Sequence, residues 1–453
     1  MIRYFILLLL VFWIVNCTVD AEPAEIEGQN WVHWRGPQYN GSTVAKDLPT
    51  DFSKTKNVKW AIDLPGPSAA TPIILGDRVF ISSTDLKEKT LLALCFDRKT
   101  GKQLWRQVTD SGYRSSGSDK ELNSNSKDNF AHPSPVTDGK QVIFFYGHGD
   151  LVAFDLDGKK LWSRNLQKEY GDFCFQWTFG SGPTIYEGVL LMQVLQRNEP
   201  VHGRGKKNAE SFLLGIDPVL GKNIWKKSRS SKALKESLES YATPIPYEKN
   251  GRKEFLIVGG DCVTSHDPQT GNEYWRWGTW NENHKEKWWR VVPSPVTGAG
   301  VVLVCAPKKA PMYAIKLGKS GEVVNPKDLL WKSKTRGALN SDVPTPLFFQ
   351  GKFYVLNDFD RSLSSVDPAT GEIHWTTKLS RNYKWRASPV GADGKIWLMD
   401  HHGEVVVVDA EKGTIIHQVL MGKDTDDNTR ACLAIAHNNI FVRTNFKLFC
   451  IGK

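Results

Sequence analysis

Three arginines in the second half of the chain stand in similar local contexts and could together hold an anion. Arg290 and Arg386 each follow a tryptophan, Trp289 and Trp385, and precede a Ser-Pro step, and Arg430 precedes a third related segment. A guanidinium can bind a carboxylate through two parallel hydrogen bonds, and an indole can stack on a flat ligand or on the cation. If these segments face one point, they form a cationic ring suited to a planar carboxylated molecule or an acidic sugar. The alternative is that the arginines tie down loops and the tryptophans pack.

Two acids and a histidine lie in segments that we expect near the same place. Asp342, Asp358 and His401 could supply a general base or a metal ligand, although each alone is typical of an ordinary turn. Residues 424–428 are rich in oxygen ligands but lack the glycine and the distal glutamate of an EF-hand loop. The sequence therefore predicts no metal site, and it assigns no catalytic residue.

The elements that would position these side chains repeat along the chain. The clearest copy, residues 367–375, reads Asp-Pro-Ala-Thr-Gly-Glu-Ile-His-Trp. The aspartate can hydrogen-bond the turn, the glycine accepts a positive φ, and the tryptophan is a large apolar anchor. Each copy thus predicts a strand, a tight turn and a second strand. Related copies occupy 97–105, 155–162, 217–225 and 267–275, and weaker copies end at Trp331 and His417.

A small residue followed by proline precedes the first strand of each repeat, where the missing N–H of proline is not needed. These steps begin at Thr71, Ser134, Gly182, Thr243, Ser294, Thr345 and Ser388. An eighth unit, residues 431–450, has three strands, and the strand at 58–64 has no unit of its own. Joining the two would close a ring without exposed edges. The sequence predicts an all-β, eight-bladed propeller whose last blade is completed by an N-terminal strand, with seven blades as the alternative.

Charge and cysteine content narrow the function classes. The chain of 453 residues has 59 basic and 49 acidic residues, and the basic ones are scattered, which predicts a solvated surface and no nucleic-acid partner. Six cysteines follow residue 21, and no pair forms Cys-x-x-Cys, so neither a zinc site nor covalently attached haem is indicated. We expect buried free thiols in a monomer.

The N-terminus predicts export. Residues 1–21 combine a basic residue, an apolar run too short to span a bilayer, and small residues at a cleavage site, as in a signal peptide. Asn16 precedes Cys17 where a small residue is expected, which argues against a lipid anchor. We expect a lead-in at 22–57, a propeller at 58–453, no transmembrane segment in the mature chain, and a periplasmic or extracellular location.

The repeated motif resembles the docking motif of the pyrroloquinoline-quinone (PQQ) repeat propellers over residues 58–453. The lead-in segment Trp-Arg-Gly-Pro at 34–37, followed by Gly41, also resembles the N-terminus of exported bacterial members of that family. In that family the motif tryptophan packs between neighbouring blades. The resemblance implies this structural role for Trp60, Trp105, Trp162, Trp225, Trp275, Trp331 and Trp375.

The resembled family includes quinoprotein alcohol and glucose dehydrogenases, which hold PQQ and Ca²⁺ on the axis, and outer-membrane assembly lipoproteins, which are scaffolds. The alcohol-oxidising members use an adjacent cysteine pair that this chain lacks, and their metal ligands and catalytic aspartate match no motif here. We therefore expect a binding or scaffold module for a protein or small anionic ligand. A PQQ-dependent dehydrogenase of an alcohol or sugar, using PQQ with calcium, and a carbohydrate-binding or -cleaving propeller are the alternatives.

Overall fold

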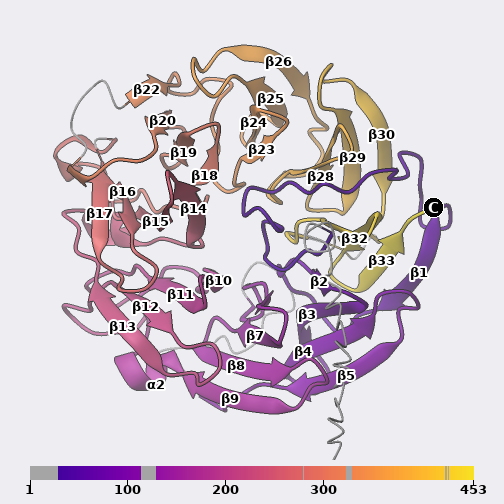
Figure 1. The fold of residues 1–453 in the computed structure, drawn as a ribbon, viewed down its shortest axis with the longest axis horizontal. Helices are drawn as coiled ribbons and strands as arrows, with labels where there is room; N and C mark the ends of the chain where they lie inside the picture. The colour runs from indigo at the N-terminus through magenta and orange to yellow at the C-terminus, as the bar shows by residue number, and fades with distance from the viewer. Residues whose placement is uncertain (1–28, 114–128, 279, 323–328, 424–425, 427) are drawn as a thin grey trace, which may run out of the picture.

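Eight sheets, each built on four antiparallel strands, stand around one axis (Figure 1). The computed structural model describes residues 29–113, 129–278, 280–322, 329–423, 426 and 428–453. Successive sheets follow one another around the ring, and the first strands of neighbouring sheets contact each other near the axis. The prediction of an all-β, eight-bladed propeller is confirmed.

The blades are numbered in chain order, and their strands run from the axis outward. Blades 1 and 2 comprise β2 (Ile73–Leu75), β3 (Arg78–Asp85), β4 (Thr90–Asp97) and β5 (Gln103–Val108), then β6 (Val136–Thr137), β7 (Gln141–Phe145), β8 (Asp150–Asp155) and β9 (Lys160–Asn165). Blades 3 and 4 comprise β10 (Thr184–Tyr186), β11 (Val189–Val194), β12 (Phe212–Ile216) and β13 (Asn223–Ser228), then β14 (Ile245–Lys249), β15 (Arg252–Gly259), β16 (Cys262–His266) and β17 (Glu273–Trp277), with β21 (Gly321–Glu322) added in parallel to β17.

The second half of the ring repeats this plan. Blades 5 and 6 comprise β18 (Val296–Gly298), β19 (Val301–Cys305), β20 (Met312–Lys316) and β22 (Leu329–Lys332), then β23 (Leu347–Phe349), β24 (Lys352–Asn357), β25 (Ser362–Val366) and β26 (Ile373–Lys378). Blades 7 and 8 comprise β27 (Val390–Ala392), β28 (Lys395–Met399), β29 (Glu404–Asp409) and β30 (Ile415–Leu420), then β31 (Ala434–Ala436), β32 (Asn439–Arg443), β33 (Lys447–Ile451) and β1 (Val58–Asp63).

The burial of the strands follows their place in the blade. A middle strand such as β7 is buried at every position, because both of its faces pack on neighbouring blades. An outer strand such as β5 alternates between exposed and buried residues, so only one face meets the next blade. Each motif tryptophan occupies such an inward position on the outer strand.

The motif turn is built as its residue types predict. Oδ1 of Asp367 accepts the backbone N–H groups of Ala369 and Thr370 at 2.9 and 2.8 Å, and Gly371 has φ of +76°. A Cβ on Gly371 would lie 2.6 Å from the ring of Trp331, the tryptophan of the preceding blade. The Nε1 of Trp331 donates to the carbonyl of Pro368 at 2.8 Å. The glycine therefore has two roles: it permits the positive φ of the turn, and it leaves room for the neighbouring indole. We call this contact of an indole with the next motif glycine the seat of the indole.

The same seat recurs around the ring. The indoles that lie against the next motif glycine and donate to its turn are Trp60, Trp105, Trp162, Trp225 and Trp331. Trp375 lies against Gly413, but its Nε1 has no hydrogen-bond partner within the described residues. Trp275 differs, since it is buried beside the added strand β21 and donates to the hydroxyl of Tyr247 at 3.2 Å.

The N-terminal strand and the C-terminal strands pair in one blade and close the ring, as the sequence predicts. Strand β1 pairs antiparallel with β33, with Trp60 opposite Cys450 and Ala61 opposite Phe449. Blade 8 therefore takes its three inner strands from one end of the chain and its outermost strand from the other, and so is built on four strands like the other blades.

The lead-in crosses the middle of the ring (Figure 1). Residue Trp31 exchanges backbone hydrogen bonds with Ile74 of blade 1, and Gly41 accepts the N–H of Gly391 in blade 7. The guanidinium of Arg35 is fully buried and donates to the carbonyls of Asn40, Pro346 and Pro389, which links blades 6 and 7. Burial lowers the pKa of Arg35 to about 10, which still leaves it charged at neutral pH. The segment closes one end of the central channel.

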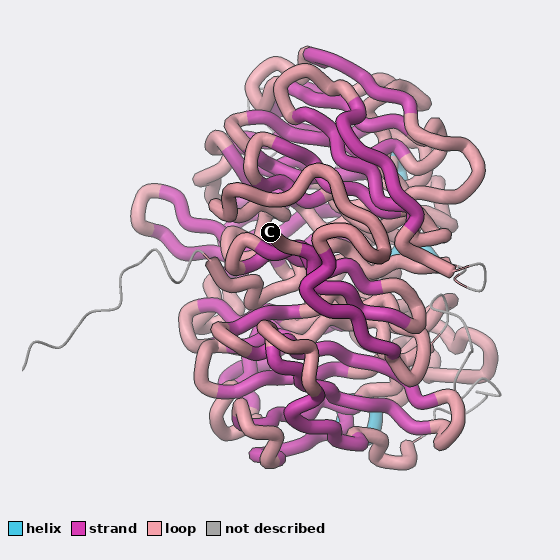
Figure 2. The backbone as a smooth tube through the Cα atoms, turned by 90° about the vertical axis from the view of Figure 1, so that its right-hand side faces the viewer, coloured by secondary structure: helices cyan, strands magenta, loops and turns pink. Residues whose placement is uncertain are grey.

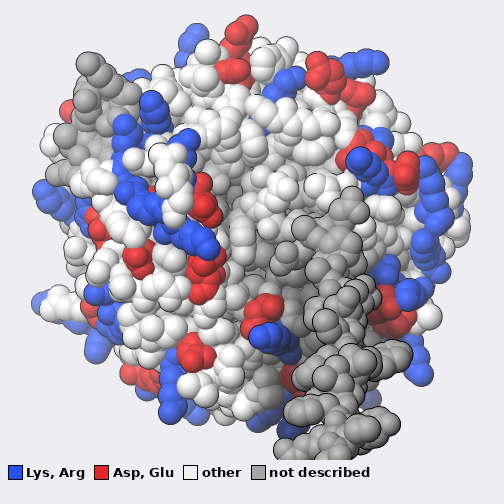
Figure 3. Space-filling model, viewed as in Figure 1, with Lys and Arg blue, Asp and Glu red and all other residues white. Residues whose placement is uncertain are grey.

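The two faces of the disc differ. The short helices α2 (Leu166–Tyr170), η1 (Lys235–Leu238) and η2 (Glu282–His284) lie on one side of the disc in Figure 2, away from the lead-in. On the lead-in face, basic and acidic side chains are interspersed around the rim (Figure 3). Within the described residues, no helix has the length and apolar character needed to cross a membrane.

Candidate functional site

A ring of eight small residues surrounds the axis, one just before the first strand of each blade. In most of them the backbone N–H donates to the side chain of the equivalent residue in the next blade, at 2.8 to 3.2 Å. The ring comprises Thr71, Ser134, Gly182, Thr243, Ser294, Thr345, Ser388 and Cys432. Seven links form, and the link from Ser134 is missing because Gly182 has no side chain. These hydrogen bonds give a structural reason for a Ser or Thr before the proline in six of the blades.

A cavity of about 420 Å³ lies over this ring. The lead-in contributes Trp34, which packs under the guanidinium of Arg35 at 5.4 Å. Two further aromatic residues, Trp177 and Tyr241, line the wall. Trp34 comes from the segment that closes one end of the channel, so the cavity opens toward the face that carries the short helices. Its volume lies within the roughly 300–1,000 Å³ typical of small-molecule sites.

Four cations line the cavity: Arg290, Lys384, Arg386 and Arg430. The three arginines are those singled out in the sequence, and they come from the segments before blades 5, 7 and 8. No aspartate or glutamate is among the described residues that line it. The cavity wall is therefore cationic, which favours an anionic occupant.

Arg290 is already paired with an acid. Its two terminal nitrogens donate to the carboxylate of Asp342 at 3.2 and 3.1 Å, and Nε lies 3.9 Å from Glu236. These carboxylates raise the pKa of Arg290 although burial opposes them. Asp342 therefore acts on the cavity through Arg290, as a group that orients the guanidinium.

Arg386 has a looser ion pair. Its Nε lies 3.9 Å from Oδ2 of Asp358 and makes no hydrogen bond within the described residues. Burial raises the pKa of Asp358 to about 6, with a contribution from the nearby charge of Asp342. Asp358 therefore neutralises the charge of Arg386 less than Asp342 neutralises that of Arg290. We expect Arg386 to contribute more than Arg290 to the binding of an anionic ligand.

The pKa of His401, the histidine singled out in the sequence, is affected by the positive charges around the cavity. His401 is buried, and its pKa is lowered to about 3, first by burial and then by Arg430, Arg386 and Lys384. It is therefore neutral at physiological pH. Its backbone joins the mouth segments, because its N–H donates to Lys384 and its carbonyl accepts from Thr429, both at 2.9 Å.

The two tryptophans beside the arginines do not line the cavity. Trp385 is completely buried in the core of blades 6 and 7, and its Nε1 donates to the carbonyl of Ser380 at 3.0 Å. Trp289 packs against the core between blades 4 and 5. Consecutive residues of an extended segment point to opposite sides, so the arginine and its preceding indole cannot both face the axis. The aromatic walls come instead from Trp34, Trp177 and Tyr241.

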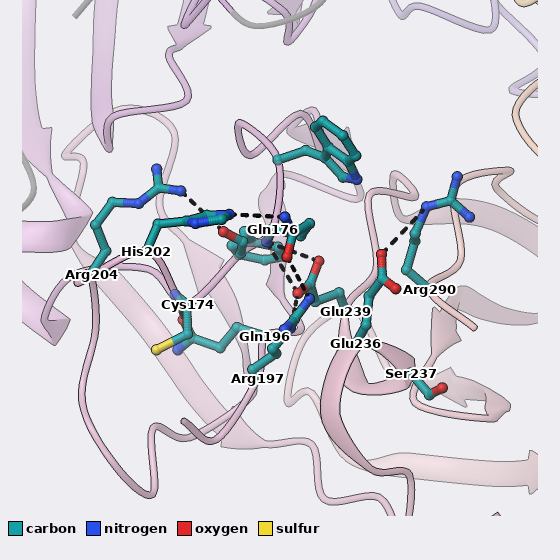
Figure 4. A network of polar contacts seen from close by, with 12 residues as sticks. Cys174, Gln176, Gln196, Arg197, His202, Arg204, Glu236, Ser237, Glu239 and Arg290 are labelled. Carbon is teal, nitrogen blue, oxygen red and sulfur yellow. Dashed lines mark hydrogen bonds and ion pairs between the residues drawn. The ribbon is translucent and has the colours of Figure 1, made fainter. Parts of the chain in front are cut away.

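A buried polar network positions Trp177 and Tyr241, two of the aromatic residues that line the cavity. No sequence motif indicates this network. Figure 4 shows Arg197 and Gln176 converging on Glu239. The hydroxyl of Tyr241 donates to Glu239 at 2.7 Å and accepts the backbone N–H of Trp177 at 3.1 Å. Glu239 thus positions both Tyr241 and Trp177. Arg197 lies 21 positions from Gln176 and 42 from Glu239 along the chain, so the network has no local pattern.

Two other features of the sequence can be placed. The six cysteines that the structure describes are free thiols, and all of them except Cys262 are buried. The acidic stretch 424–428 lies largely outside the described residues, as does the proposed signal peptide.

The family model described as outer membrane protein assembly factor BamB matches residues 50–172 and 319–451. The chain belongs to this PQQ-like propeller family. The resemblance carried by the docking motif is thereby confirmed.

Two polyvinylalcohol dehydrogenases, from Pseudomonas sp and Sphingopyxis sp. (strain 113P3), are 26% and 24% identical to the chain over 247 and 253 residues. The aligned parts cover 52% and 54% of this chain, but 33% and 34% of those proteins. The match thus spans about a third of the length of these curated relatives.

Solved structures share the fold at low sequence identity. A europium-containing methanol dehydrogenase superposes with a TM-score of 0.68 at 11% identity, covering 95% of this chain and 99% of that one. BamB from Moraxella catarrhalis gives a TM-score of 0.58 at 12% identity, covering 86% and 98%. The same architecture therefore occurs in proteins named as a dehydrogenase and as an assembly factor. The fold does not distinguish these two roles, so the function must be inferred from the residues of the cavity.

Proposed function

We propose that this PQQ-like propeller is a binding module whose axial cavity takes a small planar molecule with carboxylate groups. The observation that carries the proposal is the set of four cations around the cavity, with no acid among the described lining residues. The aromatic walls suit a flat ring system, and the guanidinium groups suit its carboxylates. A neutral sugar would leave the cations unused.

PQQ, a planar molecule with several carboxylates, fits the cationic part of this site. Arg386 and Arg430 would hold its carboxylates, and Trp177 or Tyr241 would cover a ring face. Calcium fits less well, because it needs several oxygen ligands and the described lining offers no carboxylate. We therefore expect binding of the quinone without a requirement for calcium.

A dehydrogenase is the second candidate, favoured by the names of the two relatives that match half of the chain. A bound quinone would supply the redox chemistry in such an enzyme. The chain would have to supply the proton acceptor, and Asp358 is the candidate because its pKa is raised to about 6, near the working range of a general base. This aspartate lies behind Arg386 and does not line the cavity, so the binding role has the stronger support.

The test is a titration of the protein with PQQ, with and without Ca²⁺, followed by tryptophan fluorescence. We expect saturable quenching that does not depend on Ca²⁺. Arg386→Ala should weaken binding about 10- to 100-fold, since a hydrogen bond to a charged group contributes roughly 1.5–3 kcal/mol. Arg381→Ala removes an exposed arginine from the same segment and should bind as the parent does.

Absence of binding up to about millimolar concentration, or equal binding by the Arg386→Ala and Arg381→Ala variants, would refute the proposal. Binding that requires Ca²⁺, combined with reduction of a dye by an alcohol, would move the dehydrogenase to first place.

We also infer that the chain is exported, from the signal-peptide pattern of residues 1–21 and the outer-membrane name of the family model. Cell fractionation of the full-length chain tests this. Recovery in the periplasm or medium, starting near residue 22, supports it, and a cytoplasmic protein that retains residues 1–21 contradicts it.

A further inference from the structure

Three potential metal ligands converge between blades 1 and 2, outside the lining of the axial cavity. Asp110 follows β5, and His148 and Asp150 lie at the turn between β7 and β8. One ligand atom from each lies within 4.8 Å of the others. The Nε2 of His148 is 2.8 Å from Oδ2 of Asp150 and 3.6 Å from Oδ1 of Asp110.

These separations match the donors of a single small metal ion. Ligand atoms about 2.0–2.2 Å from one ion lie about 2.8–3.1 Å from each other in octahedral geometry and about 3.3–3.6 Å in tetrahedral geometry. Neither ring nitrogen of His148 makes a hydrogen bond of acceptable geometry within the described residues, although Nε2 faces both carboxylates. Two ligands of one metal ion are close together in this way without a hydrogen bond between them, because the lone pair of each points at the ion and not at the other ligand.

The ligands are buried and held by their surroundings. The side chains of His148, Asp150 and Asp110 are 1%, 2% and 12% exposed. The N–H of Ser111 and the amide of Asn165 donate to Asp150 at 2.7 and 2.8 Å. Such contacts fix a carboxylate in position for a metal.

The backbone of the turn is fixed as well. The carbonyl of His148 accepts from the amides of Asn165 and Gln167, and its ring lies against that of Phe130 at 5.2 Å between centroids. The aspartate on this turn also lacks a lysine or arginine in its described contacts, because Asp150 is met by His148 and by neutral donors. A buried carboxylate needs a cation beside it, and within these contacts either a protonated His148 or a bound metal ion can supply that charge.

We propose that Asp110, His148 and Asp150 bind one divalent first-row transition-metal ion, such as Zn²⁺ or Mn²⁺, which ties the end of blade 1 to blade 2. One imidazole with two carboxylates favours these ions over Ca²⁺ and Mg²⁺, which prefer oxygen ligands alone. Three protein ligands leave room for water, and the partly exposed Asp110 marks the side of entry.

The experiment is equilibrium dialysis of the chelator-treated full chain against Zn²⁺, Mn²⁺, Ca²⁺ or Mg²⁺, with the bound metal measured by mass spectrometry. We expect one equivalent of Zn²⁺ or Mn²⁺, and affinity for Ca²⁺ and Mg²⁺ weaker by more than about 100-fold. Asp150→Asn and Asp110→Asn should each lower Zn²⁺ affinity by more than about 100-fold, since loss of a second-shell contact alone typically costs 10- to 100-fold. Asp157→Asn, at an exposed position of the same blade, should bind as the parent does.

Two results would overturn the proposal: no stoichiometric Zn²⁺ or Mn²⁺, or retention of the metal by both ligand variants. The Asp110→Asn variant keeps the test decisive if Asp150→Asn fails to fold, because Asp110 is the most exposed of the three. Replacement by Co²⁺ gives a second readout, since its visible absorption should appear in the parent and in Asp157→Asn but not in Asp110→Asn.

Discussion

Replacing Arg197 with methionine should destabilise the propeller mainly by leaving Glu239 without its cation. The two side chains are 8% and 0% exposed and form an ion pair. Breaking a buried pair by removing one partner costs about 3–5 kcal/mol, because an uncompensated charge remains. Gln176 and Tyr241 still donate to the carboxylate, which places the expected loss near the lower end of this range.

The loss should depend on pH with a definite sign. Burial already raises the pKa of Glu239 above its ordinary 4.5, and Arg197 opposes that rise. Arg197→Met therefore raises the pKa further. A carboxyl whose pKa is higher in the folded state favours folding when protonated, so its contribution is present below about pH 4.5 and is lost as pH rises through the folded pKa. A further rise of one pH unit in the pKa of Glu239 increases the loss of stability at higher pH by about 1.4 kcal/mol.

The assay is urea unfolding at pH 5 and pH 8 for the parent, Arg197→Met, and the double variant Arg197→Met/Glu239→Gln. We expect Arg197→Met to be more destabilised at pH 8 than at pH 5, and the double variant to recover much of the loss because a neutral amide needs no cation. Equal destabilisation at both pH values, without recovery in the double variant, would refute the reasoning and assign the loss to packing around Arg197.

Two further predictions concern single sites. Gly371→Ala and Gly351→Ala both place a side chain at φ of +76°, but only the first brings a Cβ to 2.6 Å from Trp331, whereas the second meets no atom within 4 Å. Gly371→Ala should therefore be less stable than Gly351→Ala by about 1–3 kcal/mol in urea unfolding, and equal losses would contradict the proposed seat. Asp358→Asn should flatten the pH dependence of stability, because the folded pKa of about 6 against an ordinary 3.8 makes the parent lose up to about 3 kcal/mol between pH 4 and 7. Urea midpoints measured across that range check it, and an unchanged slope would contradict it.

The fold could be predicted because its determinants are local. Asp367, Gly371 and Trp375 lie within nine residues, and their roles in a turn and a blade contact follow from their chemistry. Seven openings with a small residue before proline, together with the three-strand unit at 431–450, predict eight blades, and the unpaired strand at 58–64 predicts how the ring closes. A repeat that contains its own turn and its own anchor can be recognised without knowing what lies across the ring.

The cavity could be predicted only in part. Arg290 and Arg386 can be recognised because each lies two to four residues before a Ser-Pro step, and the serines of these steps line the axial cavity. Trp385 follows the alternative in which the tryptophan packs, since the alternation of an extended segment sends the indole into the core when the arginine faces the cavity. The network around Glu239 could not be predicted from the sequence, because only tertiary contacts bring Arg197 and Glu239 together.

The lead-in turns a channel into a binding cavity. A ring of eight blades leaves an axial passage, and the small residues at its narrow point can bind little by themselves, because their N–H groups and hydroxyls already bond one another. Arg35 fixes the lead-in across one end by donating to carbonyls of two blades, and this places Trp34 against the ring. The arginines at the other end then face an enclosed space with one opening. The anion binding that we propose would consequently depend on residues outside the repeats, because Trp34 of the lead-in lines the same cavity as the arginines before the blades.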